Sequence, residues 1–130
     1  MSNKYLLDAS SLLALLQGER SSEIVAQHIP FSAVSAVNLA EAASAFNNTG
    51  MPENEIHELF NEMNLEILPY EKEMAIATGG IRNLTRKKSM SLGDRACLVT
   101  TRHFKRIALT ADGMWLDFQA EIGVEIELIR

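Results

Sequence analysis

The chain has 130 residues, of which 47% are hydrophobic and 22% are charged, and its formal net charge is −5 at pH 7. This length fits one domain over residues 1–130, and the apolar content excludes disordered, collagen-like and low-complexity chains. The single cysteine, Cys97, excludes an internal disulfide and a cysteine-based zinc site, while the acidic net charge argues against nonspecific binding of polyanions.

The N-terminal segment contains the first predicted strand, at 4–8, and the first predicted helix, at 11–18. Lys4 precedes a largely apolar run over 5–16 that is similar to the start of a signal peptide. Asp8 and the two serines after it make this run too polar and too short to span a bilayer, and no small-residue cleavage site follows. We therefore expect a cytoplasmic protein without a membrane segment.

Further along the chain, apolar runs of strand length alternate with segments of helical period, which is typical of a parallel sheet with crossover helices. Gly79 and Gly80 weaken the middle of one helix, and Glu125 and Glu127 alternate with apolar residues in the last strand, which favours a half-solvated edge strand. The remaining predicted strands span 29–35, 65–69, 106–110 and 124–129, and the remaining helices span 22–28, 36–47, 53–63, 71–84 and 92–104, with a short one around Trp115.

The helix predicted at 53–63 is amphipathic. Ile56, Leu59, Phe60 and Met63 share one face, and glutamates occupy the opposite face. An apolar stripe with this spacing packs against another element or against a partner.

Two aspartates follow predicted strands. Asp8 ends the first strand, and Asp112 follows the fourth in the segment Leu109-Thr-Ala-Asp112. In an open parallel sheet, ligands bind in the crevice beyond the carboxyl ends of the strands. Each aspartate could equally cap a helix, because its side chain accepts hydrogen bonds from free backbone N–H groups.

Two further acids lie in apolar surroundings, where an ionised group needs a partner. Glu41 belongs to a helix of small, apolar residues, with Asn38 three residues earlier on the same face. Its neighbours leave little exposed face, which argues against a solvated surface residue. Asp94 ends the segment Ser91-Leu-Gly-Asp94, which is also close to a capping box.

These four carboxylates form a candidate metal site if they converge. At a separation of about 5 Å they would repel one another by roughly 3 kcal/mol per pair at an effective dielectric constant of about 20, so the cluster would need cations or protons. Ligation by oxygen alone favours Mg²⁺ or Mn²⁺ over Zn²⁺. Such a metal can activate water for phosphodiester cleavage.

Other catalytic chemistries have less support in the sequence. Cys97 lies among apolar helix residues, so we expect it to be buried rather than catalytic. Ser10 and Ser11 lack a Gly-x-Ser-x-Gly motif, and the histidines lack an activating neighbour, although His103 lies beside basic residues. The sequence contains no glycine-rich phosphate loop.

Positive charge is concentrated in one segment. Residues 82–106 contain eight of the 12 basic residues, and Asp94 is the only acid among them. Basic residues often only solvate helix ends, but a basic loop beside a metal site fits phosphate binding better. Aromatic residues are scarce, so recognition by base stacking is not expected. We predict nucleic-acid contacts from Arg86, Lys87, Lys88, Arg95 and Arg102.

The four acids, their order and their settings resemble the PIN-domain family, and within it the VapC-type toxins of bacterial and archaeal toxin–antitoxin pairs. The resemblance covers essentially the whole chain. Each motif alone is weak, but their order and separations make the set specific. The motifs are Leu7-Asp8-Ala-Ser10, Asn38-Leu-Ala-Glu41, Ser91-Leu-Gly-Asp94-Arg-Ala, and Leu109-Thr-Ala-Asp112 with Trp115 after it.

The resemblance implies a three-layer α/β/α sandwich with a central parallel sheet of four to five strands, and a Mg²⁺- or Mn²⁺-dependent endoribonuclease. It implies an RNA substrate, a homodimer, and an antitoxin protein whose amphipathic segment covers a groove, with the helix at 53–63 as one wall. The implied catalytic residues, which would bind metal directly or through water, are Asp8, Glu41, Asp94 and Asp112, and the implied supporting polar residues are Ser10, Asn38 and Thr110.

One departure from the family pattern is Gly93, where alanine is commoner, and we expect looser geometry there at most. Two alternative functions remain open. A phospho-receiver or an aspartyl phosphatase would need further acids, which the segment Leu7-Asp8-Ala-Ser10 lacks. A noncatalytic PIN-like module that binds RNA or a protein is compatible with the sequence.

Overall fold

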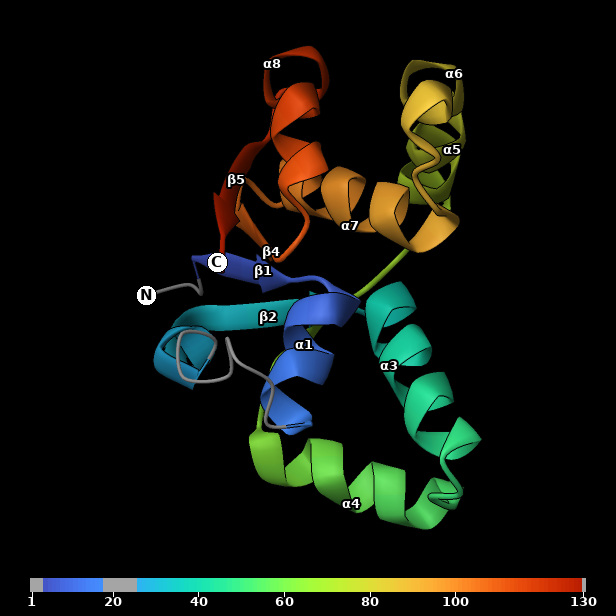
Figure 1. Ribbon diagram of the computed structural model, residues 1–130, viewed down its shortest axis with the longest axis vertical. Helices are drawn as coiled ribbons and strands as arrows, with labels where there is room; N and C mark the ends of the chain where they lie inside the picture. Colours follow the sequence, from blue (N-terminus) through green and yellow to red (C-terminus); the bar gives the residue numbers. More distant parts are fainter. Residues whose placement is uncertain (1–3, 18–25, 130) are drawn as a thin grey trace.

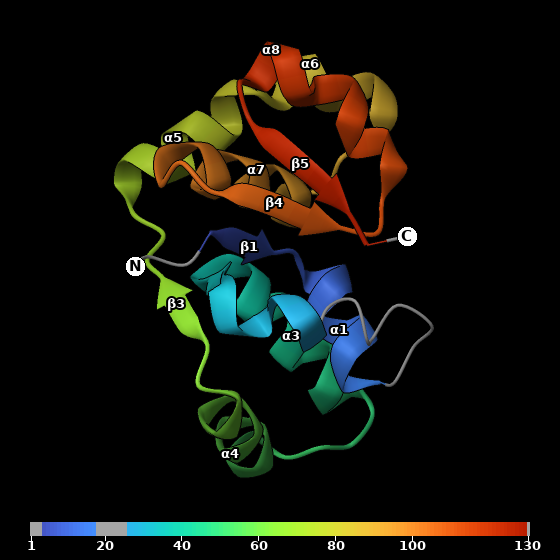
Figure 2. The same ribbon diagram turned by 90° about the vertical axis from the view of Figure 1, so that its left-hand side faces the viewer.

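The fold is built on a five-stranded sheet, described in a computed structural model over residues 4–17 and 26–129. All neighbouring strands are parallel, in the order β3-β2-β1-β4-β5 (Figures 1 and 2). The five predicted strands are confirmed, and β5 is an edge strand with Glu125 and Glu127 exposed. The strands are β1 (Tyr5–Leu7), β2 (Ser32–Ser35), β3 (Glu66–Leu68), β4 (Ile107–Thr110) and β5 (Glu125–Leu128).

Helices and short 3-10 turns connect these strands. Within the described ranges, none of the helices has the length and apolar character needed to cross a bilayer. The helix predicted at 22–28 lies mostly outside the described residues. The α-helices are α1 (Ala9–Leu16), α3 (Ala36–Asn48), α4 (Glu53–Met63), α5 (Lys72–Gly80), α6 (Arg82–Thr85), α7 (Leu92–His103) and α8 (Gln119–Ile122), and the 3-10 turns are η1 (Ile29–Phe31), η2 (Arg86–Lys88) and η3 (Gly113–Phe118).

Two segments differ from the sequence prediction. Residues 29–31, predicted to open a strand, form η1, because Pro30 has no backbone N–H to donate to a sheet. The helix predicted at 71–84 is broken at Ile81, directly after Gly79 and Gly80, which are poor helix formers. The short helix around Trp115 is η3, and α8 follows it directly.

Helices cover both faces of the sheet. Successive residues of a strand point to opposite faces, so Leu6 belongs to a core with α5, α7 and α8, while Leu7 belongs to a second core with α1 and α3. Trp115 is fully buried in the first core. The three-layer α/β/α sandwich is therefore confirmed. Figure 1 shows α6 and α8 at one end of the long axis and α4 at the other.

The carboxyl ends of the strands meet the N-termini of several helices. α1 follows β1, α3 follows β2, and η3 follows β4, so all three begin at this edge. α7 precedes β4 and runs back along it, which brings its N-terminus to the same edge, and α3 packs against α7. The strand order changes direction at β1 and β4. A crevice for ligands is expected beyond the ends of these two strands.

Candidate active site

Asp8 lies at the centre of this edge, directly after β1, and is only 4% exposed. Its Oδ1 accepts from the Ser11 backbone N–H at 2.8 Å, which caps α1, and both carboxylate oxygens lie 2.8 Å from the Ser10 hydroxyl. Its Oδ2 accepts from Thr110 Oγ1 at 2.6 Å. Burial raises the pKa of Asp8, and these hydrogen bonds lower it by less.

Thr110 connects Asp8 with Asp112. The Thr110 hydroxyl donates to Asp8 and accepts from the Asp112 backbone N–H at 3.1 Å. The Asp112 carboxylate accepts from the Met114 backbone N–H at 3.0 Å, so it caps η3, and the residue is exposed. Asp112 therefore reaches Asp8 through its backbone rather than through its carboxylate.

Asp94 lies in the first turn of α7, which Ser91 caps, and it is half-buried. Its backbone N–H donates to Ser91 Oγ at 3.1 Å, and its Oδ2 accepts from the Ser91 backbone N–H at 3.3 Å. The capping box suggested by the sequence is therefore present. The negative charge of Asp94 also lies at the N-terminal end of a helix, where the helix dipole favours it.

Glu41 lies on α3 and reaches across to the first turn of α7. Asn38, which is 1% exposed, donates from Nδ2 to Glu41 Oε1 at 2.8 Å and to the Gly93 carbonyl at 3.1 Å. The predicted pairing of Asn38 with Glu41 is thus present. The expectation that Glu41 has little exposed face is wrong, because Glu41 itself is exposed while Asn38 beneath it is buried.

The expectation for Gly93 is also wrong. A Cβ atom at this position would overlap the Glu41 carboxylate, so the missing side chain leaves the space that the carboxylate occupies. Gly93 therefore allows a close contact between α3 and α7 instead of loosening the site.

Cys97 is fully buried in α7. Burial raises the pKa of the Cys97 thiol well above its usual value, and the negative charges of Asp8, Asp94 and Glu41 raise it further. All three carboxylates therefore lie close enough to Cys97 for their charges to affect its thiol. Among residues 4–17 and 26–129, however, no three acidic, histidine or cysteine side chains are arranged to ligate one metal ion together.

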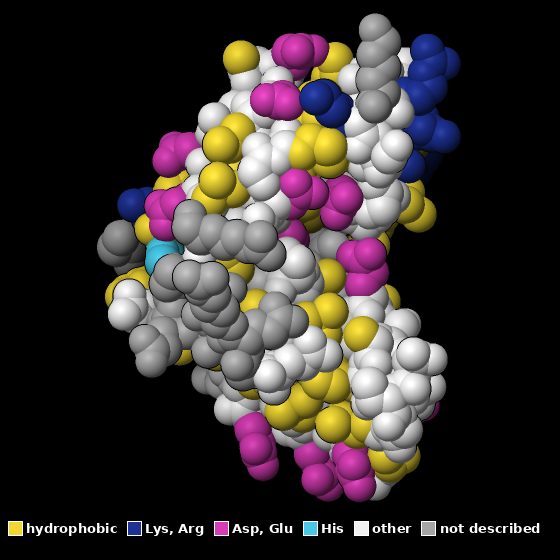
Figure 3. All heavy atoms as spheres, viewed as in Figure 1, with side chains coloured by type: hydrophobic (Ala, Val, Ile, Leu, Met, Phe, Trp, Pro, Cys, Tyr) yellow, Lys and Arg dark blue, Asp and Glu magenta, His cyan; other side chains and the backbone are white. Residues whose placement is uncertain are grey.

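The basic segment divides into surface and interior residues. Arg95 is only 9% exposed and donates from Nη1 to the Thr78 carbonyl at 3.1 Å, so its predicted contact with nucleic acid is wrong. Arg102 is exposed but donates to the Ile122 carbonyl at 3.1 Å. Arg86 and Lys88 are exposed, and Lys and Arg side chains gather at the end of the molecule that carries α6 (Figure 3). The Lys87 side chain lies outside the described part.

Sequence reasoning missed two serines that support the site. Ser11 is fully buried and donates from Oγ to the Leu109 carbonyl at 2.7 Å, joining α1 to β4. Ser35 caps α3 and donates to Asn38 Oδ1 at 2.9 Å. Ser35 directly precedes a predicted helix, and serine is favoured at the N-cap position. The sequence could therefore have identified the capping role of Ser35. No sequence signal identifies the bond from Ser11.

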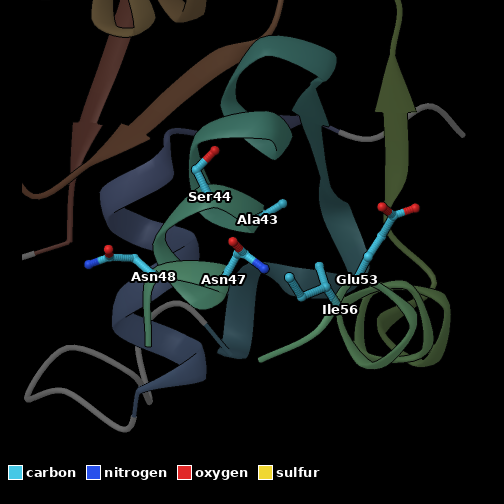
Figure 4. Close-up of a pocket in the computed structure, with 6 residues that line it drawn as sticks. All are labelled: Ala43, Ser44, Asn47, Asn48, Glu53 and Ile56. Carbon is cyan, nitrogen blue, oxygen red and sulfur yellow. The ribbon is translucent and has the colours of Figure 1, made fainter. Parts of the chain in front are cut away.

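A shallow pocket of about 460 Å³ lies between α3 and α4 (Figure 4). Part of the apolar face of α4 packs within the protein. Ile56 is buried, and Phe60 and Met63 pack against the core that includes residues of α1 and α3. Of the residues suggested as a groove wall, Ile56 lines this pocket. The lining residues are Ala43, Ser44, Asn47, Asn48, Glu53 and Ile56.

Comparisons with known proteins found structural relatives only. No family model and no curated protein sequence matches the chain. A chain of the DNA-bound VapBC structure from Salmonella typhimurium has 20% identity and a TM-score of 0.74, with 100% of both chains covered. A chain of a toxin–antitoxin complex from Klebsiella pneumoniae has 16% identity and a TM-score of 0.73, over 97% of this chain and 98% of that one.

A third structure, of VapBC2 from Rickettsia felis bound to a DNA fragment from its promoter, has 16% identity and a TM-score of 0.70, over 95% of this chain and 97% of that one. At these identities the likeness shows a shared fold. It agrees with the α/β sandwich of the family that the sequence motifs resemble.

Proposed function

We propose that this chain is a metal-dependent endoribonuclease and the toxin of a toxin–antitoxin pair. The observation that carries the proposal is the placement of Asp8 directly after β1, with the Glu41 carboxylate held by Asn38 against Gly93, next to Asp94, at the same end of the sheet. Asp112 joins this group through Thr110. Structures with the same fold are described as VapBC or toxin–antitoxin complexes, and this supports the toxin assignment.

The donor set fits Mg²⁺ or Mn²⁺, because the site offers carboxylate oxygens and the one cysteine of the sequence, Cys97, is fully buried. Since no three side chains of the described residues ligate one point together, part of the coordination would come from water, which Mg²⁺ commonly retains. Asp8, Glu41, Asp94 and Asp112 would hold the ion directly or through water. The bound ion would supply a polarised water and stabilise negative charge on the phosphate.

The surrounding residues keep the acids in place. Ser10 and Thr110 donate hydrogen bonds to Asp8, which favours its charged form against the effect of burial. Asn38 orients Glu41, and Ser91 orients Asp94. The RNA backbone would be bound by the exposed positive charge of Arg86, Lys87 and Lys88, with Arg102 further along α7.

The proposed partners are a cognate antitoxin and a second copy of the chain, in the cytoplasm. The apolar and amide-lined pocket between α3 and α4 could take part of an antitoxin segment. This assignment rests on the resemblance and on the neighbours with the same fold, which are described as complexes.

A second candidate is a noncatalytic module that binds RNA or protein. It is favoured by the capping bonds of Asp8, Asp94 and Asp112, because each carboxylate already has a structural role at a helix terminus.

An RNA cleavage assay with mapped ends distinguishes the two candidates. The purified protein should cleave RNA with Mg²⁺ or Mn²⁺, and a chelator should abolish cleavage. Asp8→Asn and Asp94→Asn should lower the rate by about a hundredfold or more, as expected when a metal ligand is lost. Glu58→Gln, on the exposed face of α4, is the charge-matched control and should cleave normally. Cleavage that survives chelation or both substitutions would contradict the metal mechanism.

A further inference from the structure

Gly93 is a buried glycine in a helix, where glycine is usually unfavourable. It does not serve an unusual backbone conformation, because positive φ among the described glycines is confined to Gly50 and Gly123. A Cβ at position 93 would overlap both oxygens of the Glu41 carboxylate. Glycine is therefore required at position 93 because a side chain there would occupy the space of the Glu41 carboxylate.

Asn38 fixes the close approach of Glu41 to Gly93. Its side-chain amide has two hydrogens, and Nδ2 donates both to Glu41 Oε1 at 2.8 Å and to the Gly93 carbonyl at 3.1 Å. Ser35 Oγ donates to Asn38 Oδ1 at 2.9 Å, which leaves the amide one orientation. Because Asn38 is 1% exposed, water competes little for these bonds. The Glu41 carboxylate is thus held against the first turn of α7.

We propose that Gly93 is a positioning residue, whose missing side chain sets where the Glu41 carboxylate lies relative to Asp94 and thereby sets the affinity of the metal site. This inference rests on the proposed function, in which Glu41 is a metal ligand. Alanine at position 93 would displace the carboxylate. The displaced atoms are the end of a flexible side chain, so the Gly93→Ala variant is expected to fold.

Binding of Mn²⁺ tests the inference without RNA. Gly93→Ala should weaken the affinity for Mn²⁺ by about tenfold, measured by calorimetry or from the electron paramagnetic resonance of free Mn²⁺. Gly79→Ala is the matched control, because Gly79 is also helical and has nothing within 4 Å of an added Cβ. It should bind Mn²⁺ like the wild type. Equal affinities for wild type and Gly93→Ala would overturn the proposal.

A double-mutant cycle separates action through Glu41 from a general disturbance. In a Glu41→Gln background the charge that Gly93 positions is already absent, so adding Gly93→Ala should weaken Mn²⁺ binding by less than about twofold. A further tenfold loss in that background would overturn the proposal, because Gly93 would then act by another route.

Nuclear magnetic resonance of the metal-free protein keeps the inference separate from the proposed function. Gly93→Ala should shift the Asn38 side-chain amide signals and speed their exchange with water, whereas Gly79→Ala should not. Unchanged Asn38 signals would overturn the positioning role. Failure of the wild type to bind Mn²⁺ would overturn the metal site itself, and the Asn38 signals would still report whether Gly93 holds Glu41 in place.

Discussion

Asp8 combines a deeply buried carboxylate with several hydrogen-bond donors. Burial disfavours its charged form and raises its pKa, while bonds from Thr110, Ser11 and Ser10 oppose that effect. The folded protein therefore binds the Asp8 proton more tightly than the unfolded chain does. As the pH rises above the unfolded pKa, near 3.8, and through the raised folded pKa, the folded state loses stability. In the absence of metal, Asp8 therefore destabilises the fold at neutral pH.

Asp8→Asn removes this charge and should change how stability depends on pH. Its free energy of unfolding, relative to wild type in the presence of a chelator, should increase from pH 4 to pH 7, measured by urea denaturation. Asparagine still caps α1, so the change with pH is more informative than the absolute difference. Glu58→Gln is the exposed control. A difference between Asp8→Asn and wild type that stays constant with pH would contradict the electrostatic account.

Arg95 is a buried cation whose guanidinium donates one hydrogen bond within the described part of the chain, from Nη1 to the Thr78 carbonyl. Its Nε has no partner among the described residues, and a buried donor without an acceptor costs stability. Arg95→Met keeps the apolar stem and removes the charge, so it should raise the free energy of unfolding by about 1 kcal/mol and leave RNA cleavage unchanged. A loss of stability would show that the guanidinium is well compensated.

The sequence predicts where the candidate acids lie in the fold better than it predicts their surroundings. Asp8, Asp94 and Asp112 lie beside strand ends or helix starts, which are local features, and the capping role of each follows from its position. The buried hydrogen bond from Ser11 to Leu109 joins residues 98 positions apart, so no local pattern reveals it. Arg95 is misassigned because a basic residue in a basic segment does not show, from sequence alone, which side of its helix faces the core.

At the scale of elements, hydrophobic periodicity locates the strands and the longer helices, and α4 has the same bounds as its prediction. Errors arise where a backbone property decides the conformation. Pro30 replaces the start of a strand with η1, and Gly79 and Gly80 precede the break between α5 and α6.

The glycines of α5 give a prediction at this scale. Gly79 has a helical backbone and open space where a Cβ would lie, so alanine there loses less conformational entropy on folding and adds no clash. Gly79→Ala should raise the free energy of unfolding by about 0.5–1 kcal/mol, measured by thermal or urea denaturation. A loss of stability would mean that the break at Ile81 needs both glycines.

The distribution of charge matters more than the net charge of the whole molecule. The net charge of −5 argues against a nucleic-acid ligand, but eight of the 12 basic residues lie in one segment. The structure removes Arg95 from that surface, and Lys88 lies 3.4 Å from Asp117 in an exposed ion pair. The positive surface is therefore smaller than the sequence suggests. Substitution of Arg86 and Lys88 tests whether this surface binds RNA.

The double variant Arg86→Gln/Lys88→Gln should weaken RNA binding by reducing phosphate contacts. Binding is measured with a labelled RNA over a range of salt concentrations, in an Asp94→Asn background in which cleavage is expected to be slow. Removing two contacts to single-stranded RNA should lower the magnitude of the slope of log K against log salt by about 1.4. The exposed ion pair with Asp117 contributes little to stability, so the fold should persist. Lys4→Gln is the control, because Lys4 directly precedes β1 at the amino ends of the strands. An equal decrease of the slope in Lys4→Gln would mean that RNA binds through diffuse charge rather than at this segment.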